Sequence, residues 1–349
     1  MQENGYPIEK IKSLAGNLVN RKILNAESAG RGNNNKVYRV QTTGGFYALK
    51  IYSSQIGEPW DRLGTEFSAL NFLYSNGFTC IPRAIAKDQK NNCALYEWID
   101  GQPIASISNE ELHIVVSFLL QIQSYIENKM AKSINNASAS CFSINQVLKQ
   151  IDRRLRRLTD ISSEMPQLKS FLRDQFKPIY QDQCEIVFET LSKYDLDKDR
   201  ELEAYELALS PSDFGIHNTL RSTDGKLIFF DFEYFGWDDP VKMVSDAILH
   251  PGNSFSLNSQ KIFYNLFKDY YKARDPYFIL RFQITYPLYA LIWCLIMLGD
   301  FLPDQWARRV FAGESKPKID FQIKKLGEAQ ILLNNISAPG FSSRITNNK

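Results

Sequence analysis

The sequence predicts an α+β fold in two lobes: a small N-terminal lobe (residues 1–99) with an antiparallel sheet, and a larger, mostly helical C-terminal lobe (residues 100–338). Two alternating apolar runs, KVYRV and FYALKIY, flank a Gly44-Gly45 turn, which is typical of a β-hairpin. Apolar residues recur at helical spacing after residue 100. The 349 residues are ordinarily enough for two such units with a buried core.

A glycine- and asparagine-rich segment precedes this hairpin and contains Gly30, Gly32, Asn33 and Asn34. Both residue types accept positive φ and let backbone N–H groups approach a phosphate. Lys50 stands inside the apolar strand YALKIY, where its charge needs an anionic partner such as a phosphate. Most such loops are only turns, but a loop, a hairpin and an A-L-K strand in this order indicate a nucleotide site.

A helix is expected over residues 65–73, with Glu66 in its first turn. There Glu66 either pairs with Lys50 or only complements the helix dipole. A strand over residues 93–99 then ends at an Asp-Gly turn, where a hinge between the lobes would lie. Backbone groups of Glu97, Trp98 and Ile99 are candidates for binding the edge of an adenine.

The segment SPSDFGIHN, followed by IFFDFEYFGWDDP, holds the candidate catalytic groups. Asp213 can orient an attacking hydroxyl and take its proton, while Asn218 and Asp231 supply oxygen ligands for Mg²⁺. The apolar run before Asp231 predicts a buried strand that holds the carboxylate. Each motif alone could arise by chance in an aspartate-rich chain, but their order and spacing favour phosphoryl transfer.

From about Ala29 to Pro251 the chain resembles the aminoglycoside phosphotransferase and choline kinase superfamily, small-molecule relatives of protein kinases. The family's H-G-D-L-H-x-x-N loop matches at Asp213 and Asn218, and its D-F-E-Y, G and D-P elements occur from residue 231 to residue 240. The two loop histidines are replaced by Pro211 and Gly215. These changes alter the loop's hydrogen bonds but remove no group that touches phosphate or metal.

The resemblance implies a protein-kinase-like fold and transfer of the γ-phosphate of ATP, or of GTP, to a hydroxyl of a small molecule with Mg²⁺. The acceptor stays open among sugars, amino alcohols and aminoglycoside-like compounds. A nucleotide-binding regulator without activity is the alternative, suggested by Pro211. Candidate acceptor ligands, chosen by their neighbourhood in the sequence, are Glu233, Asp238, Asp239 and Asp246.

Composition limits the classes of partner and the cellular compartment expected for the protein. The formal net charge of +2 implies no nucleic-acid partner. The five cysteines are scattered without C-x-x-C spacing, which argues against a disulfide framework or zinc site and favours the cytoplasm. The first residues lack the apolar region of a signal peptide.

Four further segments allow more than one interpretation. Residues 284–298 are apolar but short and contain Pro287, so we expect a core helix and no membrane span. Tyr286, Tyr289 and Trp293 there are packing residues or an aromatic wall for a cation. An expected helix over 144–158 carries four arginines, at 153, 154, 156 and 157, which indicate a solvated face or a phosphate site. Residues 195–206 imitate a calcium loop, with Arg200 where glycine is required, and the polar tail after Ala338 (339–349) is expected to fray.

Overall fold

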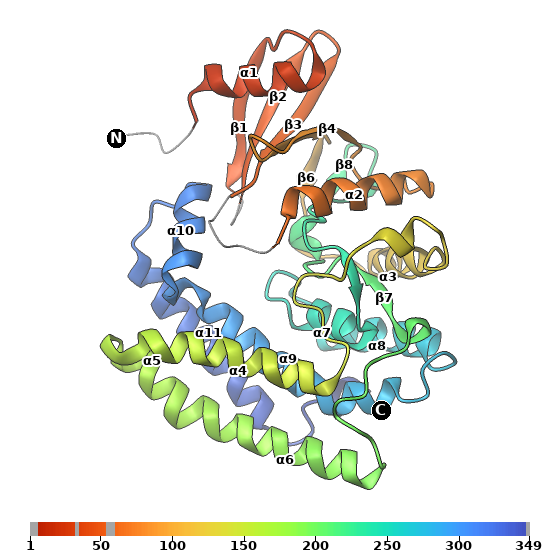
Figure 1. The fold of residues 1–349 in the computed structure, drawn as a ribbon, viewed down its shortest axis with the longest axis vertical. Helices are drawn as coiled ribbons and strands as arrows, with labels where there is room; N and C mark the ends of the chain where they lie inside the picture. The colour runs from red at the N-terminus through yellow and green to blue at the C-terminus, as the bar shows by residue number, and fades with distance from the viewer. Residues whose placement is uncertain (1–5, 32–34, 54–59, 347–349) are drawn as a thin grey trace.

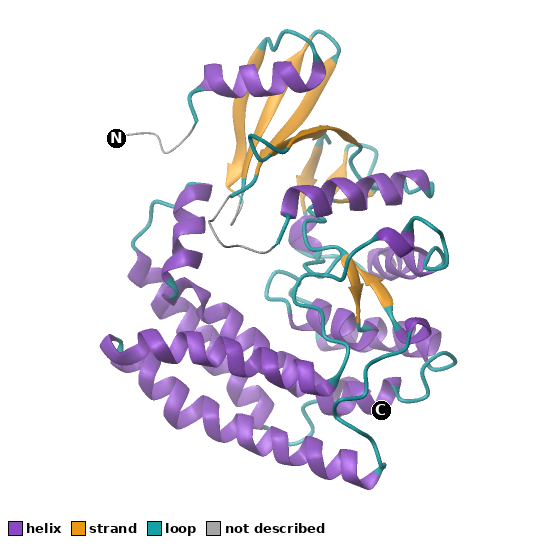
Figure 2. Cartoon of the chain, viewed as in Figure 1, coloured by secondary structure: helices purple, strands orange, loops and turns teal. Residues whose placement is uncertain are grey.

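The computed structural model describes residues 6–31, 35–53 and 60–346, and these form two lobes (Figures 1 and 2). The upper lobe in Figure 1 holds an antiparallel five-stranded sheet in the order β1-β2-β3-β5-β4. Its strands are β1 (Asn25–Arg31), β2 (Lys36–Thr42), β3 (Gly45–Ile51), β4 (Ala84–Asp88) and β5 (Cys93–Glu97). The predicted α+β class is confirmed.

The expected hairpin is formed by β2 and β3. Thr42 pairs with Gly45, whose φ of 124° is a backbone conformation that glycine adopts without strain. This register places Lys50 between Val37 of β2 and Ala94 of β5, in the middle of the sheet.

Two helices accompany the sheet, α1 (Ile8–Val19) and α2 (Arg62–Ser75). The helix expected over 65–73 begins earlier, because the Asp61 side chain caps it by accepting a hydrogen bond from the N–H of Gly64. Glu66 therefore lies in the second turn, and its placement in the first turn was wrong. Since dipole effects fade beyond the first turn, they do not explain this buried carboxylate.

The lower lobe is mostly helical, as predicted (Figure 2). Its helices are α3 (Asn109–Gln123), α4 (Ile144–Ile161), α5 (Pro166–Ser170), α6 (Lys177–Lys193), α7 (Pro240–Leu249), α8 (Leu257–Tyr271), α9 (Phe278–Met297), α10 (Pro303–Ala312), α11 (Lys318–Ser337) and α12 (Ser343–Thr346). Two small antiparallel sheets carry the loops of the site. They are β6 (Gly101–Pro103) with β8 (Thr219–Ser222) and β9 (Leu227–Phe229), and β7 (Ala208–Ser210) with β10 (Gly236–Asp238).

Helix α9 is the central core helix of this lobe. Among the described residues one segment, Phe278–Phe301, is long and apolar enough to cross a membrane, and 78% of its apolar window is buried inside the protein. Pro287 lies within the continuous helix and cannot donate to the carbonyl of Gln283. The hydroxyl of Ser342 donates to that carbonyl instead, at 2.9 Å.

The same contact corrects the expectation that the chain frays after Ala338. Phe341 stacks on Tyr286 with ring centroids 4.9 Å apart, and Ile345 in α12 is buried. The segment 341–345 docks because it supplies apolar side chains as well as the donor for α9. The residues beyond Thr346 lie outside the described part.

The calcium-loop interpretation of residues 195–206 is also not supported. Glu206, which would supply the bidentate calcium ligand, is buried and pairs with Arg200 at 2.8 Å. Its side chain additionally accepts the N–H of Glu203 and caps a 3₁₀ turn over Ala204–Glu206. The carboxylate is thus committed to structural contacts.

Candidate active site

Lys50 is the centre of a buried charge network between the two lobes. Its side chain is 8% exposed, and its ammonium donates to Glu66 at 2.6 Å and to Asp231 at 2.5 Å. Burial alone would lower the pKa of Lys50, but the surrounding carboxylates hold it well above its usual value. The ammonium is therefore permanently charged and positioned where the lobes meet.

A second glutamate completes this network. Glu233 is buried and lies 3.3 Å from Lys50 and 3.4 Å from Arg62, and it accepts the amide of Asn35. Burial raises the pKa of Glu233 to about 7, against the opposing effect of Lys50. Glu233 was expected to bind the acceptor, but its side chain instead contacts Lys50 of β3, Arg62 of α2 and Asn35, and so joins the upper lobe to the lower lobe.

The metal candidates Asn218 and Asp231 lie at one end of a short strand ladder. Thr219 of β8 pairs with Phe229 of β9, and the N–H of Phe230 donates to the carbonyl of Asn218. The amide nitrogen of Asn218 donates to the carbonyl of Asp213 at 2.9 Å, and within the described part of the chain its amide oxygen accepts no hydrogen bond. The strand ladder and the hydrogen bond from Asn218 to Asp213 thus place the three candidate residues Asp213, Asn218 and Asp231 near one another.

Asp231 adopts a left-handed backbone conformation with φ of 68°, uncommon for a residue other than glycine. Such conformations cost roughly 1–3 kcal/mol and cluster at functional sites. The ion pair with Lys50 and the buried β9 before it hold Asp231 in this conformation. The carboxylate is thereby turned toward the upper lobe and not along the strand.

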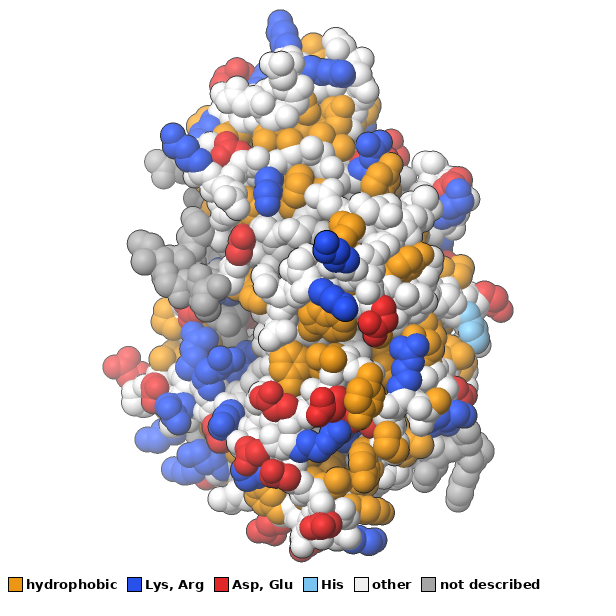
Figure 3. Space-filling view, turned by 45° about the vertical axis from the view of Figure 1, so that its right-hand side comes forward, with side chains coloured by type: hydrophobic (Ala, Val, Ile, Leu, Met, Phe, Trp, Pro, Cys, Tyr) orange, Lys and Arg blue, Asp and Glu red, His pale blue; other side chains and the backbone are white. Residues whose placement is uncertain are grey.

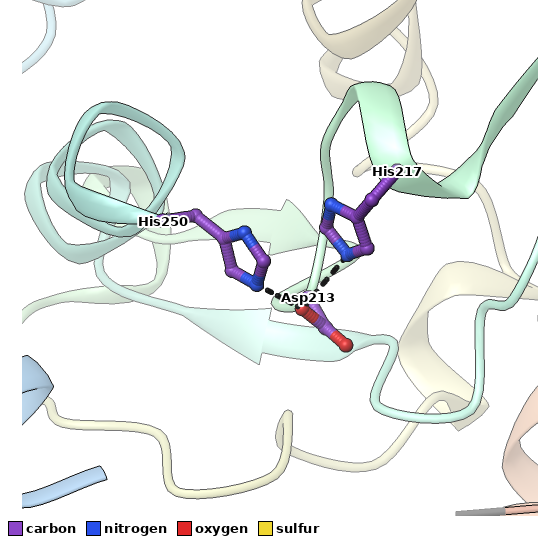
Figure 4. A group of neighbouring side chains, drawn as sticks. All are labelled: Asp213, His217 and His250. Atoms are coloured by element: carbon purple, nitrogen blue, oxygen red, sulfur yellow. Dashed lines mark ion pairs between the residues drawn. The ribbon is translucent and has the colours of Figure 1, made fainter. Parts of the chain in front are cut away.

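Asp213 is held by two histidines, which approach one of its oxygens (Figure 4). Oδ1 lies 3.1 Å from Nε2 of His250 and 3.4 Å from Nε2 of His217, and the two imidazoles stack with centroids 4.1 Å apart. Figure 4 shows the other oxygen pointing away from both rings. That oxygen is available to an acceptor hydroxyl.

The backbone selects the tautomer of His250. The N–H of Gly252 donates to its Nδ1 at 2.9 Å, so the proton of the neutral ring is on Nε2 and is donated to Asp213. The same protonation argues against a metal ion bound by this histidine, since a ligating Nε2 must carry no proton. Burial would raise the pKa of Asp213, but hydrogen bonds from His217 and His250 hold it below its usual value.

Asn253 supplies the remaining scaffold of the catalytic loop. Its side chain accepts the N–H of Ile216 and donates to the carbonyls of Phe214 and Ala247. A Cβ at Gly215 would lie 1.9 Å from its Oδ1. Glycine at this position, where the family has histidine, is therefore required by the side chain of Asn253.

Two of the expected acceptor ligands are structural. Asp238 is fully buried, pairs with Lys242 at 2.9 Å and accepts the N–H of Cys141. Asp239 caps α7 by accepting the N–H of Val241 and pairs with Arg281. Because both carboxylates are enclosed and fully paired, their assignment as acceptor ligands was wrong.

Asp246 is connected to Asp213 through Trp293 and His250. Its side chain is 12% exposed, and its two oxygens accept from Lys242 at 2.8 Å and from the indole N–H of Trp293 at 2.9 Å. The Trp293 ring contacts His250 edge-on with centroids 4.8 Å apart. Trp293 is itself buried, as are Tyr286 and Tyr289, so the three residues do not form an exposed aromatic wall.

The structure describes only part of the expected nucleotide contacts. Gly30 lies within β1, while Gly32, Asn33 and Asn34 are outside the described residues. At the hinge, the N–H of Glu97 already donates to Arg83, so this residue has no free backbone donor. Within the described part of the chain, the backbone N–H groups of Trp98 and Ile99 form no hydrogen bond and remain candidates.

Sequence reasoning assigned no site role to several groups that the fold brings to the site: His217, His250, Asn253, Asn35 and Arg62. His217 adjoins Asn218, which is a usable signal. His250 and Asn253 follow α7 and carry no motif of their own, so only the tertiary structure reveals them.

Together these groups can position phosphates beside a fixed ammonium, hold a cation between two oxygen ligands, and accept a proton at Asp213. The site is that of a small-molecule kinase, as the chain's relatives bear out. A family model described as the phosphotransferase enzyme family matches residues 25–242, and the chain belongs to this family. The predicted superfamily is confirmed.

Solved structures show the same fold at low identity. The choline kinase LicA from Streptococcus pneumoniae matches with 16% identity and a TM-score of 0.59, covering 93% of this chain and 98% of that one. A spectinomycin phosphotransferase in complex with ADP and spectinomycin matches with 12% identity and a TM-score of 0.57, covering 92% and 98%. A Plasmodium vivax ethanolamine kinase matches with 14% identity and a TM-score of 0.54, covering 97% and 87%. The sequence matches no curated protein.

Proposed function

We propose that the protein transfers the γ-phosphate of ATP or GTP to a hydroxyl group of a small molecule, with Mg²⁺ and with Asp213 as the base. The observation that carries the proposal is the geometry of Asp213, which offers one oxygen free of the histidines. The nucleotides bound to LicA (AMP) and to the spectinomycin phosphotransferase (ADP) support a nucleotide donor.

Each group has a defined part in the proposed reaction. Lys50 binds the phosphates and is kept in place by Glu66. Asp213 orients the acceptor hydroxyl and takes its proton as the new O–P bond forms and the bond to the β,γ-bridging oxygen breaks, which releases ADP.

The oxygen donors near the base suit Mg²⁺. Asn218 keeps its amide oxygen free, and Asp231 is 30% exposed with one oxygen on Lys50. Carboxylate and amide oxygens are ligands that this hard cation prefers. When bound, the cation would neutralise charge on the β- and γ-phosphates.

The reason for considering an inactive nucleotide-binding regulator is weakened by the contacts of the loop around Asp213. It rested on the replacement of the loop histidine by Pro211. His250, His217 and Asn253 supply hydrogen bonds to the same loop from other positions.

We also propose a reducing, cytoplasmic setting, supported by five free cysteines, of which Cys93, Cys141 and Cys294 are buried.

The decisive experiment is Asp213→Asn, tested by ADP release with a panel of hydroxyl acceptors. The variant keeps size and hydrogen bonding but removes the negative charge. We expect kcat on the true acceptor to fall by roughly 10²–10⁴-fold, with MgATP affinity within a few-fold of wild type. The exposed Asp224 provides the control Asp224→Asn, which should leave turnover unchanged. Near-wild-type turnover of Asp213→Asn, or a wild type that phosphorylates no acceptor, would contradict the proposal.

A further inference from the structure

The four arginines of α4 do not face the same way. Arg153, Arg156 and Arg157 are exposed, as expected for a solvated face, and Arg157 pairs with Asp304 at 2.9 Å. Arg154 is half-buried instead. It shares a helical stripe with three buried residues of α4, Val147, Ile151 and Leu158.

Arg154 lacks a counter-ion. Over the described part of the chain it forms no ion pair and no hydrogen bond, and its Nε atom is buried without a partner. Asp246 attracts it electrostatically, but both Asp246 oxygens already accept hydrogen bonds from Lys242 and Trp293. The buried Nε of this half-buried guanidinium has no acceptor, which is unfavourable, so a ligand that supplies the missing acceptor is expected.

Electrostatic attraction relates this arginine to Asp246, and a series of side-chain contacts connects Asp246 to Asp213. Asp246 accepts the indole N–H of Trp293, whose ring contacts His250, which in turn donates to Asp213. Helix α9 packs against both α4, which carries Arg154, and α7, which carries Asp246. All three helices belong to the lower lobe (Figure 1).

We propose that Arg154 binds an oxyanion, a phosphate or a carboxylate, carried by the acceptor alcohol. The proposal rests on the proposed function and names the acceptor class for it. A guanidinium matches both groups with two parallel hydrogen bonds. The carboxylates expected to bind a cationic acceptor are already occupied: Asp238 by Lys242 and Asp239 by Arg281.

The surroundings of Arg154 fit an anion. Burial lowers the pKa of Arg154 to about 10, and the neighbouring Arg153 and Arg157 act in the same direction. An anionic ligand would offset the burial and the neighbouring positive charges that disfavour the charged form of Arg154. Lys and Arg side chains also gather at the lower left of Figure 3, below the atoms drawn in grey. A basic surface raises the local concentration of anions.

The activity test compares acceptors that differ only in charge. Full-length protein with MgATP is given glycerol, glycerol 3-phosphate and glycerate, a hexose with its 6-phosphate and its uronate, and choline as a cation. We expect the highest kcat/KM with a phosphate- or carboxylate-bearing alcohol. Arg154→Gln should raise the KM for that acceptor about 10- to 100-fold without weakening MgATP. Arg154→Lys keeps the charge but loses the two parallel N–H donors, so its KM for that acceptor should lie between those of wild type and Arg154→Gln. Arg153→Gln is the matched control.

A binding test makes the proposal independent of turnover. With the donor site filled by a non-hydrolysable MgATP analogue, inorganic phosphate or acetate is titrated and the melting temperature is followed. Wild type and Arg153→Gln should be stabilised, and Arg154→Gln should not. Stabilisation by phosphate alone assigns a phosphate group, and stabilisation by acetate assigns a carboxylate.

The outcomes separate the two proposals. If a neutral or cationic alcohol is the best acceptor and Arg154→Gln does not change its KM, the anion site is wrong while the kinase function stands. If wild type is not stabilised by either anion, the anion site is likewise wrong. If anions stabilise through Arg154 but no alcohol is phosphorylated, the anion site stands and the kinase function fails.

Discussion

Replacement of Lys50 by methionine should destabilise the protein strongly, because it leaves Glu66, Asp231 and Glu233 without their shared cation. Removing one partner of a buried ion pair typically costs about 3–5 kcal/mol. The side chains of Glu66 and Glu233 are 5% and 2% exposed, so water cannot replace the ammonium at either group. Asp231, at 30% exposed, is partly solvated and contributes less.

The companion change Glu66→Gln should act in opposite directions in the two backgrounds. In wild type it removes a charge-assisted hydrogen bond and costs about 1.5 kcal/mol or less, since Lys50 keeps Asp231 and Glu233. In Lys50→Met it removes an uncompensated buried anion and should therefore stabilise. The coupling free energy should reach about 1–3 kcal/mol, as for other residues in contact.

Urea unfolding without nucleotide at pH 8, above the wild-type pKa of Glu233 of about 7, measures the free energy of unfolding of the wild type, both single variants and the double variant. Lys22→Met is the control, because Lys22 is exposed and its loss should change stability by less than about 0.5 kcal/mol. If Glu66→Gln costs the same free energy with and without Lys50, the reasoning from a shared buried network is refuted.

Four further predictions follow from single contacts. Asp231→Ala should weaken MgATP binding at least about tenfold and make the remaining affinity insensitive to Mg²⁺ in calorimetry; equal metal dependence in both proteins would contradict this. His250→Gln, which keeps an N–H donor, should retain most of the kcat that His250→Leu loses at unchanged KM for MgATP; equal losses would exclude positioning of the base. Gly215→Ala should destabilise by about 1–3 kcal/mol in thermal unfolding, since its Cβ would lie 1.9 Å from Asn253, whereas Gly327→Ala, with open space in α11, should not. Millimolar calcium should leave the melting temperature unchanged because Glu206 is paired, and a rise specific to calcium would revive the calcium loop.

The parts of the site that the sequence predicts are those carried by contiguous segments. The hairpin and the strand around Lys50 are encoded by alternation and a turn, so their register follows from local pattern. Asp213, Asn218 and Asp231 stand on two successive segments that a short strand ladder joins. The confirmed fold class depends on the same short-range signals.

The acidic residues after Asp231 show where this reasoning stops. Glu233, Asp238 and Asp239 resemble ligands in the sequence because they are clustered carboxylates near the metal segment. Their partners, Arg62, Lys242 and Arg281, include side chains from α2 and α9, remote in the chain. For Glu233 and Asp239 the partner cations are distant in the sequence, so no local pattern reports whether the carboxylate pairs or binds a ligand.

The same principle explains how the catalytic loop tolerates the loss of both family histidines. A loop histidine is needed only for the hydrogen bonds it supplies, and donors can be supplied from any element that packs against the loop. Here the turn after α7 provides His250 for Asp213 and Asn253 for the backbone on either side of Gly215. A histidine side chain at position 215 would occupy the space that the Asn253 side chain fills. Glycine at 215 and asparagine at 253 therefore depend on each other. Restoring histidine at position 215 alone should therefore lower activity, and restoring it together with Asn253→Gly should recover more of the activity than either single change.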